Sequence, residues 1–249
     1  MNLEINELKT IAENRQLENT LKRSEKRLHK LASDLIHAQE NERKRLAFEL
    51  HDVLGKSLTA IKFCVENIVV TKKHLDKDTK GQLDTVVTMV QETIRETQEI
   101  TKNLWPPVLD DLGILATISW YSRQFESTYP WIFIDQRVKI TENEIPDLIK
   151  IVIFRILQEA MNNSVKHSEC KNIRLSLTKI SRGIQFIVAD DGRGFVPKNT
   201  PHPIEARQGV GLLSMKERSR LSGGIFEITS KPESGTLIKV TWPINLIPR

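Results

Sequence analysis

The chain has 249 residues, of which 39% are hydrophobic, so it is long enough for one large domain or two modest ones with a buried core. Its 37 basic residues are interleaved with 32 acidic ones, and the net charge of +5 is not gathered into a patch that would follow a phosphate backbone. We therefore expect no nucleic-acid partner. Cys64 and Cys170 lie far apart in unlike surroundings, which argues against a disulfide or a cysteine metal site.

Membrane and targeting signals are not evident. No apolar run approaches the roughly 18 residues that a membrane span needs, and the N-terminus lacks the zones of a secretory signal. We expect this fragment to be cytoplasmic.

The first 70 residues carry a helical pattern in two registers. The heptad seam of a coiled coil is formed by Leu17, Leu21, Leu28, Leu31, Leu35 and Ala38. The next seam residue, Leu46, follows the polar run QENERKR, which amounts to a four-residue stutter near residues 38–46 that would locally unwind a supercoil. A helical stripe then continues through Leu50, Leu54, Leu58, Ile61, Val65 and Ile68. One helix is predicted from the N-terminus to about residue 70.

A second helix is predicted after a polar loop over residues 71–82, with Gly81 as the helix breaker. It carries one apolar side from Leu83 to Leu104 and stops at Trp105-Pro106-Pro107, because proline lacks a donor and disfavours helix in the residue before it. Two antiparallel helices with one stripe each cannot bury those stripes alone. Two copies can, as a dimeric four-helix bundle.

Beyond residue 110 helices alternate with strands. Helices are predicted over residues 114–125, 146–167 and 210–223, and strands over residues 131–138, 173–179, 183–190, 225–230 and 236–244. Strands outnumber helices and include hairpin neighbours, which favours an α/β sandwich with a mixed sheet over a doubly wound parallel one.

The long helix carries a polar face near its C-terminal end. Glu159, Asn163, Lys166 and His167 follow one another at helical spacing, with Asn162 a quarter-turn away. A carboxylate, an amide oxygen and an ammonium together suit a hydrated magnesium ion bridging to phosphates. Taken alone, the segment is also compatible with a solvated polar face.

Two glycine-containing segments follow in order. VADDGRGF ends a strand with Asp190 and Asp191 and opens a loop with Gly192 and Gly194, and QGVGLLSMKER places Gly209 and Gly211 at a helix start. Glycines before a helix let backbone amides approach phosphates. Neither a GxxxxGK[ST] loop nor a βαβ fingerprint is present, so the predicted nucleotide site is of another kind.

In this order the segments resemble the ATP-binding domain of sensor histidine kinases, which shares its fold with type II topoisomerase, Hsp90-type and MutL-type ATPases. EAMNNSVKH matches the asparagine-containing box, DDGRGF the first glycine box and GVGLL the second. The resemblance implies ATP and magnesium as cofactors, with Asn163 as the magnesium ligand and Glu159 as an outer-shell or activating carboxylate. It places Lys166 and His167 beside the phosphates.

The same resemblance assigns the nucleobase side of the site. Asp190 corresponds to the aspartate that accepts a hydrogen bond from the adenine amino group, and Thr236, after Gly235, would support that aspartate. The stretch between the glycine boxes would be a mobile lid over the triphosphate, since its proline and polar content suits a loop that orders on binding.

The stretch FELHDVLGKSLTAIK places His51 and Asp52 at the edge of the apolar stripe. A neutral imidazole attacks a γ-phosphate only if its nucleophilic nitrogen is unprotonated, and an adjacent carboxylate can accept the proton of the other ring nitrogen. By itself such a pair is usually a surface feature. ERKRLAFELHDVLGKSLTAIK also resembles the phosphoacceptor helix of the histidine kinase subfamily with a His-Asp motif, which contains nitrate-responsive and lipid-fluidity sensors, and LWPPVLDDLGIL resembles its passage to the ATP domain.

This resemblance covers about residues 17–243 and implies a transmitter region. It divides the chain into a signalling coiled coil (1–40), a dimerisation and phosphotransfer hairpin (41–110) and a catalytic ATP-binding domain (111–249). His51 would be the phosphoacceptor and Asp52 the general base. The implied partners are a second copy of the chain and a response regulator receiver domain. Membrane attachment would come only through an upstream sensory region absent from this sequence.

Lys56 departs from the subfamily pattern. The residue five beyond the histidine is usually a glutamine that, with the aspartate, positions a water to dephosphorylate the receiver, and an ammonium can neither orient that water nor accept its proton. Weak or absent phosphatase activity is therefore expected. Two alternatives remain: a scaffold that binds ATP as a switch without phosphorylating itself, and a protein-serine kinase of the same fold.

Overall fold

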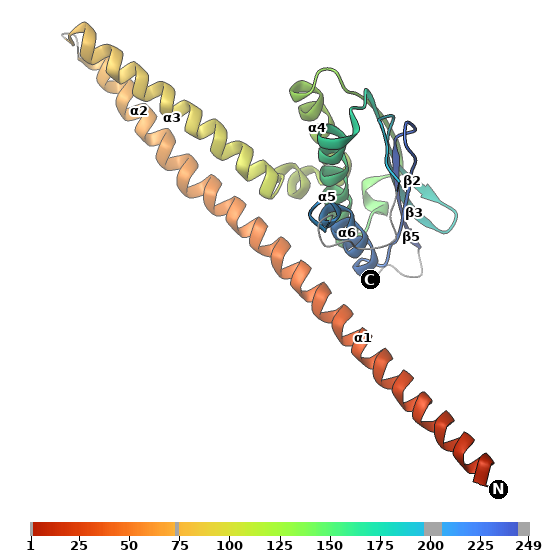
Figure 1. Ribbon diagram of the computed structural model, residues 1–249. Helices are drawn as coiled ribbons and strands as arrows, with labels where there is room; N and C mark the ends of the chain where they lie inside the picture. Colours follow the sequence, from red (N-terminus) through yellow and green to blue (C-terminus); the bar gives the residue numbers. More distant parts are fainter. Residues whose placement is uncertain (1, 73–74, 197–205, 244–249) are drawn as a thin grey trace. The chain divides into compact units, whose positions relative to one another are not determined.

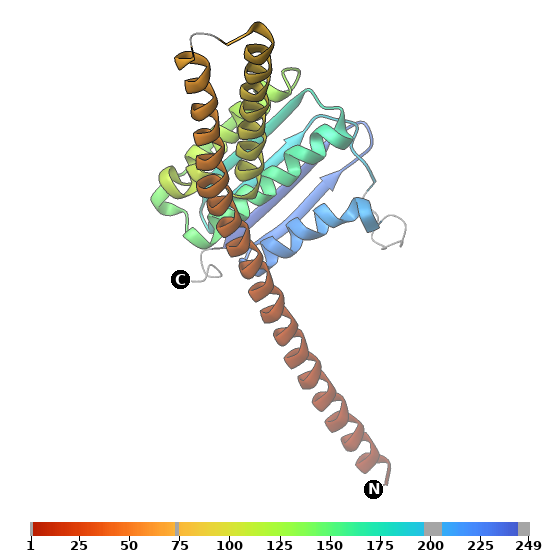
Figure 2. The same ribbon diagram turned by 90° about the vertical axis from the view of Figure 1, so that its left-hand side faces the viewer.

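The computed structural model describes residues 2–72, 75–196 and 206–243 (Figures 1 and 2). The lid expected between the glycine boxes falls largely on residues 197–205, outside the described residues. The chain forms two compact units, Met1–Trp105 and Pro106–Arg249, which are considered separately below.

All secondary structure in the described residues of the first unit is helical. α1 (Asn2–Glu49), a π-helical turn η1 (Leu50–Gly55) and α2 (Lys56–Thr71) follow without a break, and α3 (Lys77–Leu104) returns beside α2 as an antiparallel partner (Figures 1 and 2). The continuous helix predicted to about residue 70 is therefore present, and its single irregularity over the described residues is the π turn. α1 runs through the predicted stutter without interruption.

The expected role of Gly81 as a helix breaker is wrong. α3 begins at Lys77 because Asp76 caps it: one carboxylate oxygen accepts the Thr79 backbone N–H at 2.8 Å and the other accepts the Thr79 hydroxyl at 2.6 Å. Gly81 then lies in the second turn of the helix, where an added Cβ would meet nothing within 4 Å. The cap outweighs the low helix propensity of glycine.

The second unit is a mixed five-stranded sheet with the order β1-β2-β3-β5-β4. The strands are β1 (Phe133–Lys139), β2 (Asn172–Ile180), β3 (Gly183–Asp190), β4 (Ile225–Ser230) and β5 (Thr236–Pro243). β1 pairs in parallel with β2 and every other pair is antiparallel. The helices α4 (Pro107–Thr128), α5 (Asp147–Asn163) and α6 (Ala206–Leu221) cover one face of the sheet (Figure 2). The predicted α/β sandwich with a mixed sheet is confirmed.

α5 supplies much of the core between helices and sheet. Its fully buried residues include Ile149, Ile153, Phe154, Ile156, Leu157 and Met161, and the strands contribute the buried residues Leu175, Phe186, Val240 and Trp242. The indole N–H of Trp242 donates to the Ser222 hydroxyl at 2.9 Å, so this buried donor is satisfied. This packing fixes the C-terminal end of α5, where the predicted polar face lies.

The Glu142 side chain caps the helical segment of α4 that begins at Ile114. α4 is kinked at Gly113 (φ 80°), and the helix predicted from Ile114 begins again there. The Glu142 carboxylate accepts the N–H groups of Ile114 and Leu115, both at 3.0 Å, and pairs with the Lys150 ammonium at 3.1 Å. The positive φ favours glycine, and an added Cβ at residue 113 would lie 2.2 Å from the Glu142 carboxylate.

Candidate functional site

The C-terminal end of α5 carries the first pair of predicted site residues. Glu159 and Asn163 are half-buried on one face of the helix, and the Asn163 amide nitrogen donates to the Glu159 carboxylate at 3.3 Å. This bond turns the amide oxygen of Asn163 away from Glu159 and leaves it available to a cation. No group of three His, Cys, Asp or Glu side chains in the described part of the chain is arranged to hold a metal. An amide oxygen is one of the ligand types that magnesium accepts beside phosphates and water.

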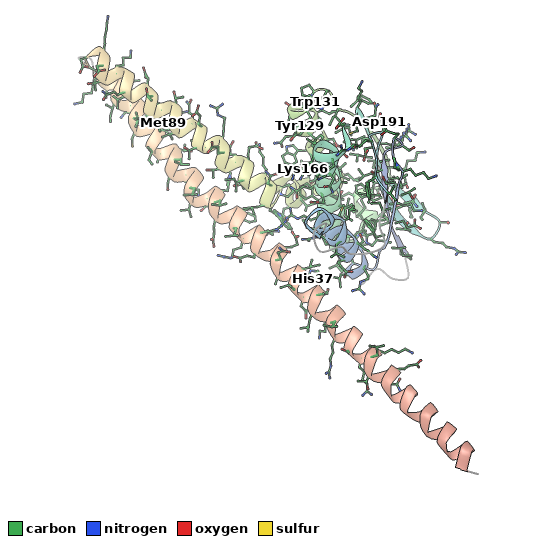
Figure 3. The ribbon with its side chains drawn as sticks, in the orientation of Figure 1. His37, Met89, Tyr129, Trp131, Lys166 and Asp191 are labelled. Atoms are coloured by element: carbon green, nitrogen blue, oxygen red, sulfur yellow. The ribbon has the colours of Figure 1, made fainter. Side chains whose placement is uncertain are left out.

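The helix changes pitch immediately after Asn163. Residues 164–168 form a π-helical turn, η3 (Ser164–Ser168), in which Lys166 (labelled in Figure 3) and His167 are exposed and Ser168 is buried. Single π turns inside helices are frequent at functional sites. The periodicity of the sequence does not reveal this turn, and Ser168 was not among the predicted site residues.

Asp190, at the end of β3, is held through one of its two oxygens. The Ser168 hydroxyl makes a short hydrogen bond to Oδ1, and the Gly192 N–H donates to the same oxygen at 3.0 Å. Thr236 stands opposite Asp190 in the β3–β5 register, but its hydroxyl shares a hydrogen bond of 3.1 Å with the Ser230 hydroxyl. The hydroxyl that contacts Asp190 is therefore that of Ser168.

Asp191, labelled in Figure 3, makes hydrogen bonds that differ from those of its neighbour Asp190. Its Oδ1 accepts the N–H groups of Lys171 and Asn172, both at 2.9 Å, and its Oδ2 accepts the Asn172 side-chain amide at 2.6 Å. Partial burial raises the pKa of Asp191, but the three hydrogen-bond donors lower it by more than burial raises it. The pKa of Asp191 therefore lies below its ordinary value. Asp191 ties down the start of β2, whereas Asp190 keeps its Oδ2 available.

Steric contact explains the glycines of the first box. A Cβ on Gly192 would lie 1.7 Å from the Ser168 hydroxyl oxygen. Gly194 has φ 58°, and a Cβ there would lie 2.0 Å from the Lys231 carbonyl oxygen. Both positions therefore require the absence of a side chain.

The glycines of the second box lie inside a helix, contrary to the expectation that they open one. α6 starts at Ala206, because Ala, Arg and Gln before Gly209 are good helix formers, and Gly209 and Gly211 fall within its first two turns. A Cβ on Gly211 would lie 1.9 Å from a Glu159 carboxylate oxygen. Gly211 thus lets α6 pack closely against the side chain beside Asn163.

In the first unit, His51 and Asp52 are exposed on the π turn η1. The Lys56 ammonium makes an ion pair with the Asp52 carboxylate one turn away, and the two side chains are 75% and 64% exposed. Sequence periodicity missed the change of pitch here too. Gly55 and the weak helix formers His51, Asp52 and Val53 were the available signal.

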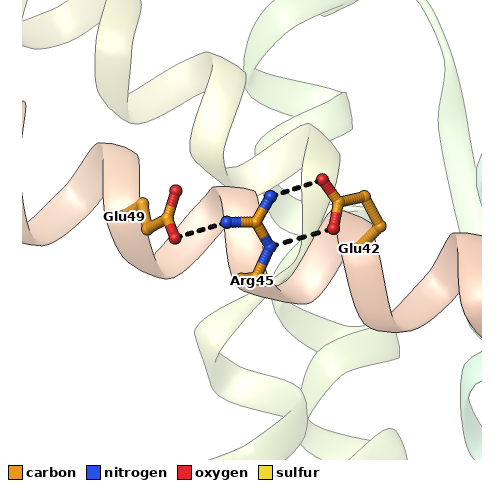
Figure 4. Close-up of polar contacts among 3 residues, drawn as sticks. All are labelled: Glu42, Arg45 and Glu49. Atoms are coloured by element: carbon orange, nitrogen blue, oxygen red, sulfur yellow. Dashed lines mark hydrogen bonds and ion pairs between the residues drawn. The ribbon is translucent and has the colours of Figure 1, made fainter.

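The helix before this turn is reinforced by charged side chains (Figure 4). Arg45 donates from Nε and Nη2 to the two carboxylate oxygens of Glu42, at 2.9 and 2.6 Å, and from Nη1 to Glu49 at 2.6 Å. These i,i+3 and i,i+4 pairs favour regular α-helix up to Glu49. The predicted stutter region ends in this reinforced helix, and the change of pitch follows it.

Two family models match the chain in the order of its units. Residues 149–246 match the family described as histidine kinase-, DNA gyrase B- and HSP90-like ATPase. These residues therefore form an ATPase-type nucleotide-binding domain. Residues 42–109, which include His51, match a family described as histidine kinase. The chain belongs to the histidine kinases and carries their transmitter region, of the type with a His-Asp acceptor motif.

A relative with a known name is similar to this chain over most of its length. The signal transduction histidine-protein kinase/phosphatase DegS of Brevibacillus brevis is 29% identical over 214 residues, which cover 85% of this chain and 53% of the relative. The chain thus spans about half the length of this relative.

Among solved structures, the histidine kinase domain of a blue-light activated kinase from Erythrobacter litoralis EL346 is 14% identical, with a TM-score of 0.47, over 84% of this chain and 95% of that one. The Acinetobacter baumannii histidine kinase AdeS is 11% identical, with a TM-score of 0.41, over 78% and 98% of the two chains. Within the described residues, no helix is both long and apolar enough to span a membrane.

Proposed function

We propose that this chain binds ATP and magnesium, transfers the γ-phosphoryl group to His51 and passes it to an aspartate of a response regulator receiver domain. The observation that carries the proposal is the exposed His51-Asp52 pair on the π turn η1, in a chain whose other unit holds the Asn163 and Asp190 site. An exposed acceptor is necessary, because the histidine must reach two different reaction partners in turn.

The nucleotide would be held at both ends. Asp190 Oδ2 accepts the adenine amino group, and Lys166 and His167, both exposed on η3, lie on the phosphate side. Asn163 offers its amide oxygen to magnesium, and Glu159 orients that amide. Magnesium, when bound, supplies positive charge that neutralises the phosphates.

At the acceptor, an unprotonated ring nitrogen of His51 attacks the γ-phosphorus. A nitrogen–phosphorus bond forms as the bond to the bridging oxygen breaks, and ADP leaves with the electron pair. The other ring nitrogen carries a proton, which Asp52 accepts or stabilises by a hydrogen bond. In the resting chain Asp52 pairs with Lys56, so this carboxylate must exchange one partner for another during the reaction.

We infer a homodimer and a three-part organisation of residues 1–40, 41–110 and 111–249. Large apolar side chains of the helical unit remain exposed in the single chain, namely Leu28, Leu31, Leu35, Ile61, Ile68, Val86, Met89 and Ile100 (Met89 is labelled in Figure 3). A second copy would bury them as a four-helix bundle. Sedimentation equilibrium should give twice the monomer mass, and a monomer at micromolar concentration would contradict this assembly.

Phosphorylation of the chain tests the main proposal. Incubation with γ-labelled ATP and magnesium should give label that is acid-labile and base-stable, and His51→Gln should abolish it. His37→Gln is the matched control, because His37 is also exposed on the long N-terminal helix (Figure 3), and it should keep the label. Acid-stable label that survives in His51→Gln would support a serine kinase instead. Nucleotide binding without label would support an ATP-switch scaffold.

Phosphatase activity is a separate proposal. Lys56 occupies the position of the expected glutamine, and an ammonium can neither accept the proton of a water nor orient that water as an amide does for attack on a phosphorylated receiver. We expect Lys56→Gln to dephosphorylate a phosphorylated receiver faster than the natural chain does. Equal rates would remove the idea.

A further inference from the structure

Asp190 is restrained unequally at its two oxygens. Oδ1 accepts both the Ser168 hydroxyl and the Gly192 N–H, whereas Oδ2 makes no hydrogen bond within residues 2–72, 75–196 and 206–243. Two donors on one oxygen fix the plane of the carboxylate as well as its position. The direction of the remaining lone pairs is therefore set before any ligand arrives.

Ser168 is itself held in place from several sides. It is 7% exposed, and its carbonyl oxygen accepts the Arg193 N–H at 2.8 Å. A Cβ on Gly192 would lie 1.7 Å from the Ser168 hydroxyl oxygen, so the loop after β3 closes directly over that hydroxyl. Asp191 ties down residues 171 and 172 just beyond the turn. The hydroxyl therefore has little freedom to leave Asp190.

Thr236, which carries the other hydroxyl near Asp190, does not hold that carboxylate. Its hydroxyl shares a hydrogen bond with the Ser230 hydroxyl, which also donates to the Gly235 carbonyl.

The π turn η3 buries Ser168, whereas the two residues before it, Lys166 and His167, are exposed. One short helical turn thus presents two side chains toward the proposed phosphate side and one toward the proposed adenine side.

We propose that Ser168 is a positioning residue for nucleobase selection: it holds Asp190 so that Oδ2 faces the adenine amino group. This inference rests on the proposed nucleotide site. Without the Ser168 hydroxyl, the carboxylate keeps a single donor, the Gly192 N–H, and can rotate about its terminal torsion. A rotated carboxylate accepts the amino group at a poorer angle, and hydrogen bonds weaken steeply with misalignment.

Two nucleotides that differ only in the amino group provide the test. Binding of ATP and of purine riboside triphosphate, which lacks that group, is measured by calorimetry on the full chain. The natural chain should prefer ATP. Ser168→Ala should weaken ATP binding about 10-fold, the usual scale for one hydrogen bond to a charged group, and should change binding of the analogue less than about 2-fold. In an Asp190→Asn background, Ser168→Ala should no longer alter the preference.

Ser164→Ala is the matched control. Ser164 is also a buried serine of η3, but its hydroxyl donates to the Ala160 carbonyl at 3.0 Å, so neither affinity should change. Equal loss of both nucleotides in Ser168→Ala would assign Ser168 a merely structural role and overturn the inference, as would unchanged ATP binding. If the natural chain bound neither nucleotide, the proposed function itself would fail.

Discussion

Glu142 lies in a short connecting turn, η2 (Glu142–Glu144), and we expect its side chain to contribute to the free energy of unfolding of the second unit. Its carboxylate caps the helical segment that starts at Ile114, 28 residues earlier in the chain, and pairs with Lys150. The side chains of Lys150 and Glu142 are only 20% and 29% exposed, so solvent screens this pair less than a surface ion pair. We expect Glu142→Gln to lower the free energy of unfolding.

The size of this decrease in the free energy of unfolding follows from the contacts that Glu142→Gln removes. A glutamine keeps one acceptor oxygen for one of the two backbone N–H groups, leaves the other without its partner and removes the ion pair. Loss of a helix cap costs about 0.5–2 kcal/mol, and hydrogen bonds to charged groups contribute about 1.5–3 kcal/mol each. Allowing for the oxygen that remains, we expect a loss of about 2 kcal/mol at pH 7.

The effect should also depend on pH. Partial burial raises the pKa of Glu142, but the N–H groups of Leu115 and Ile114 and the Lys150 ammonium lower it more, so the folded-state pKa lies below the ordinary value of 4.5. Stabilisation by such a group is fully present above the unfolded-state pKa and is lost as pH falls through the folded-state pKa. The difference between the natural chain and Glu142→Gln should therefore shrink below about pH 4.5.

Urea unfolding, followed by tryptophan fluorescence at one fixed protein concentration, measures this difference at pH 7 and pH 4. Glu227→Gln is the control, because Glu227 pairs with Lys239 across β4 and β5 but is 52% exposed, and its loss should be below about 1 kcal/mol. A loss in Glu142→Gln no larger than in this control would refute the reasoning. So would a difference that stays constant between pH 7 and pH 4.

Three further substitutions test local features. Asp76→Ala should destabilise the helical unit by about 1 kcal/mol, because it removes the cap of α3, and urea unfolding followed by circular dichroism would measure it; no change would mean that another group caps this helix. Gly81→Ala should stabilise the same helix by about 0.5–1 kcal/mol, since the added Cβ meets open space. Gly192→Ala should lower ATP affinity at least 10-fold in calorimetry, because its Cβ would displace the Ser168 hydroxyl from Asp190; unchanged affinity would show that the contact is dispensable.

Much of the architecture was predictable from local patterns. The apolar stripe through Leu50, Leu54 and Leu58 predicted the long helix, and Trp105-Pro106-Pro107 marked its partner's end. Alternating strands and hairpin neighbours predicted the mixed sheet. These signals are local, because periodicity and proline act within a few residues.

Two errors arose where one local signal outweighs another, and one omission arose where a contact between distant segments gives a residue its role. Gly81 read as a breaker, but the cap at Asp76 starts α3 before it. Gly209 and Gly211 read as a helix start, but α6 begins at Ala206. Ser168 was overlooked, because its meaning depends on a carboxylate 22 residues later in the chain.

By itself, the sequence determined the inventory of chemical groups: an imidazole at His51 beside the carboxylate of Asp52, an amide at Asn163, a carboxylate at Asp190 and an ammonium at Lys56. Only the tertiary structure decided how they are oriented. It put His51 on a π turn and paired Asp52 with Lys56. It also gave Asp190 the Ser168 hydroxyl, because β3 ends where the turn after α5 folds back against it. Composition and spacing specify which groups are present, whereas the direction of a lone pair depends on packing between segments far apart in the chain.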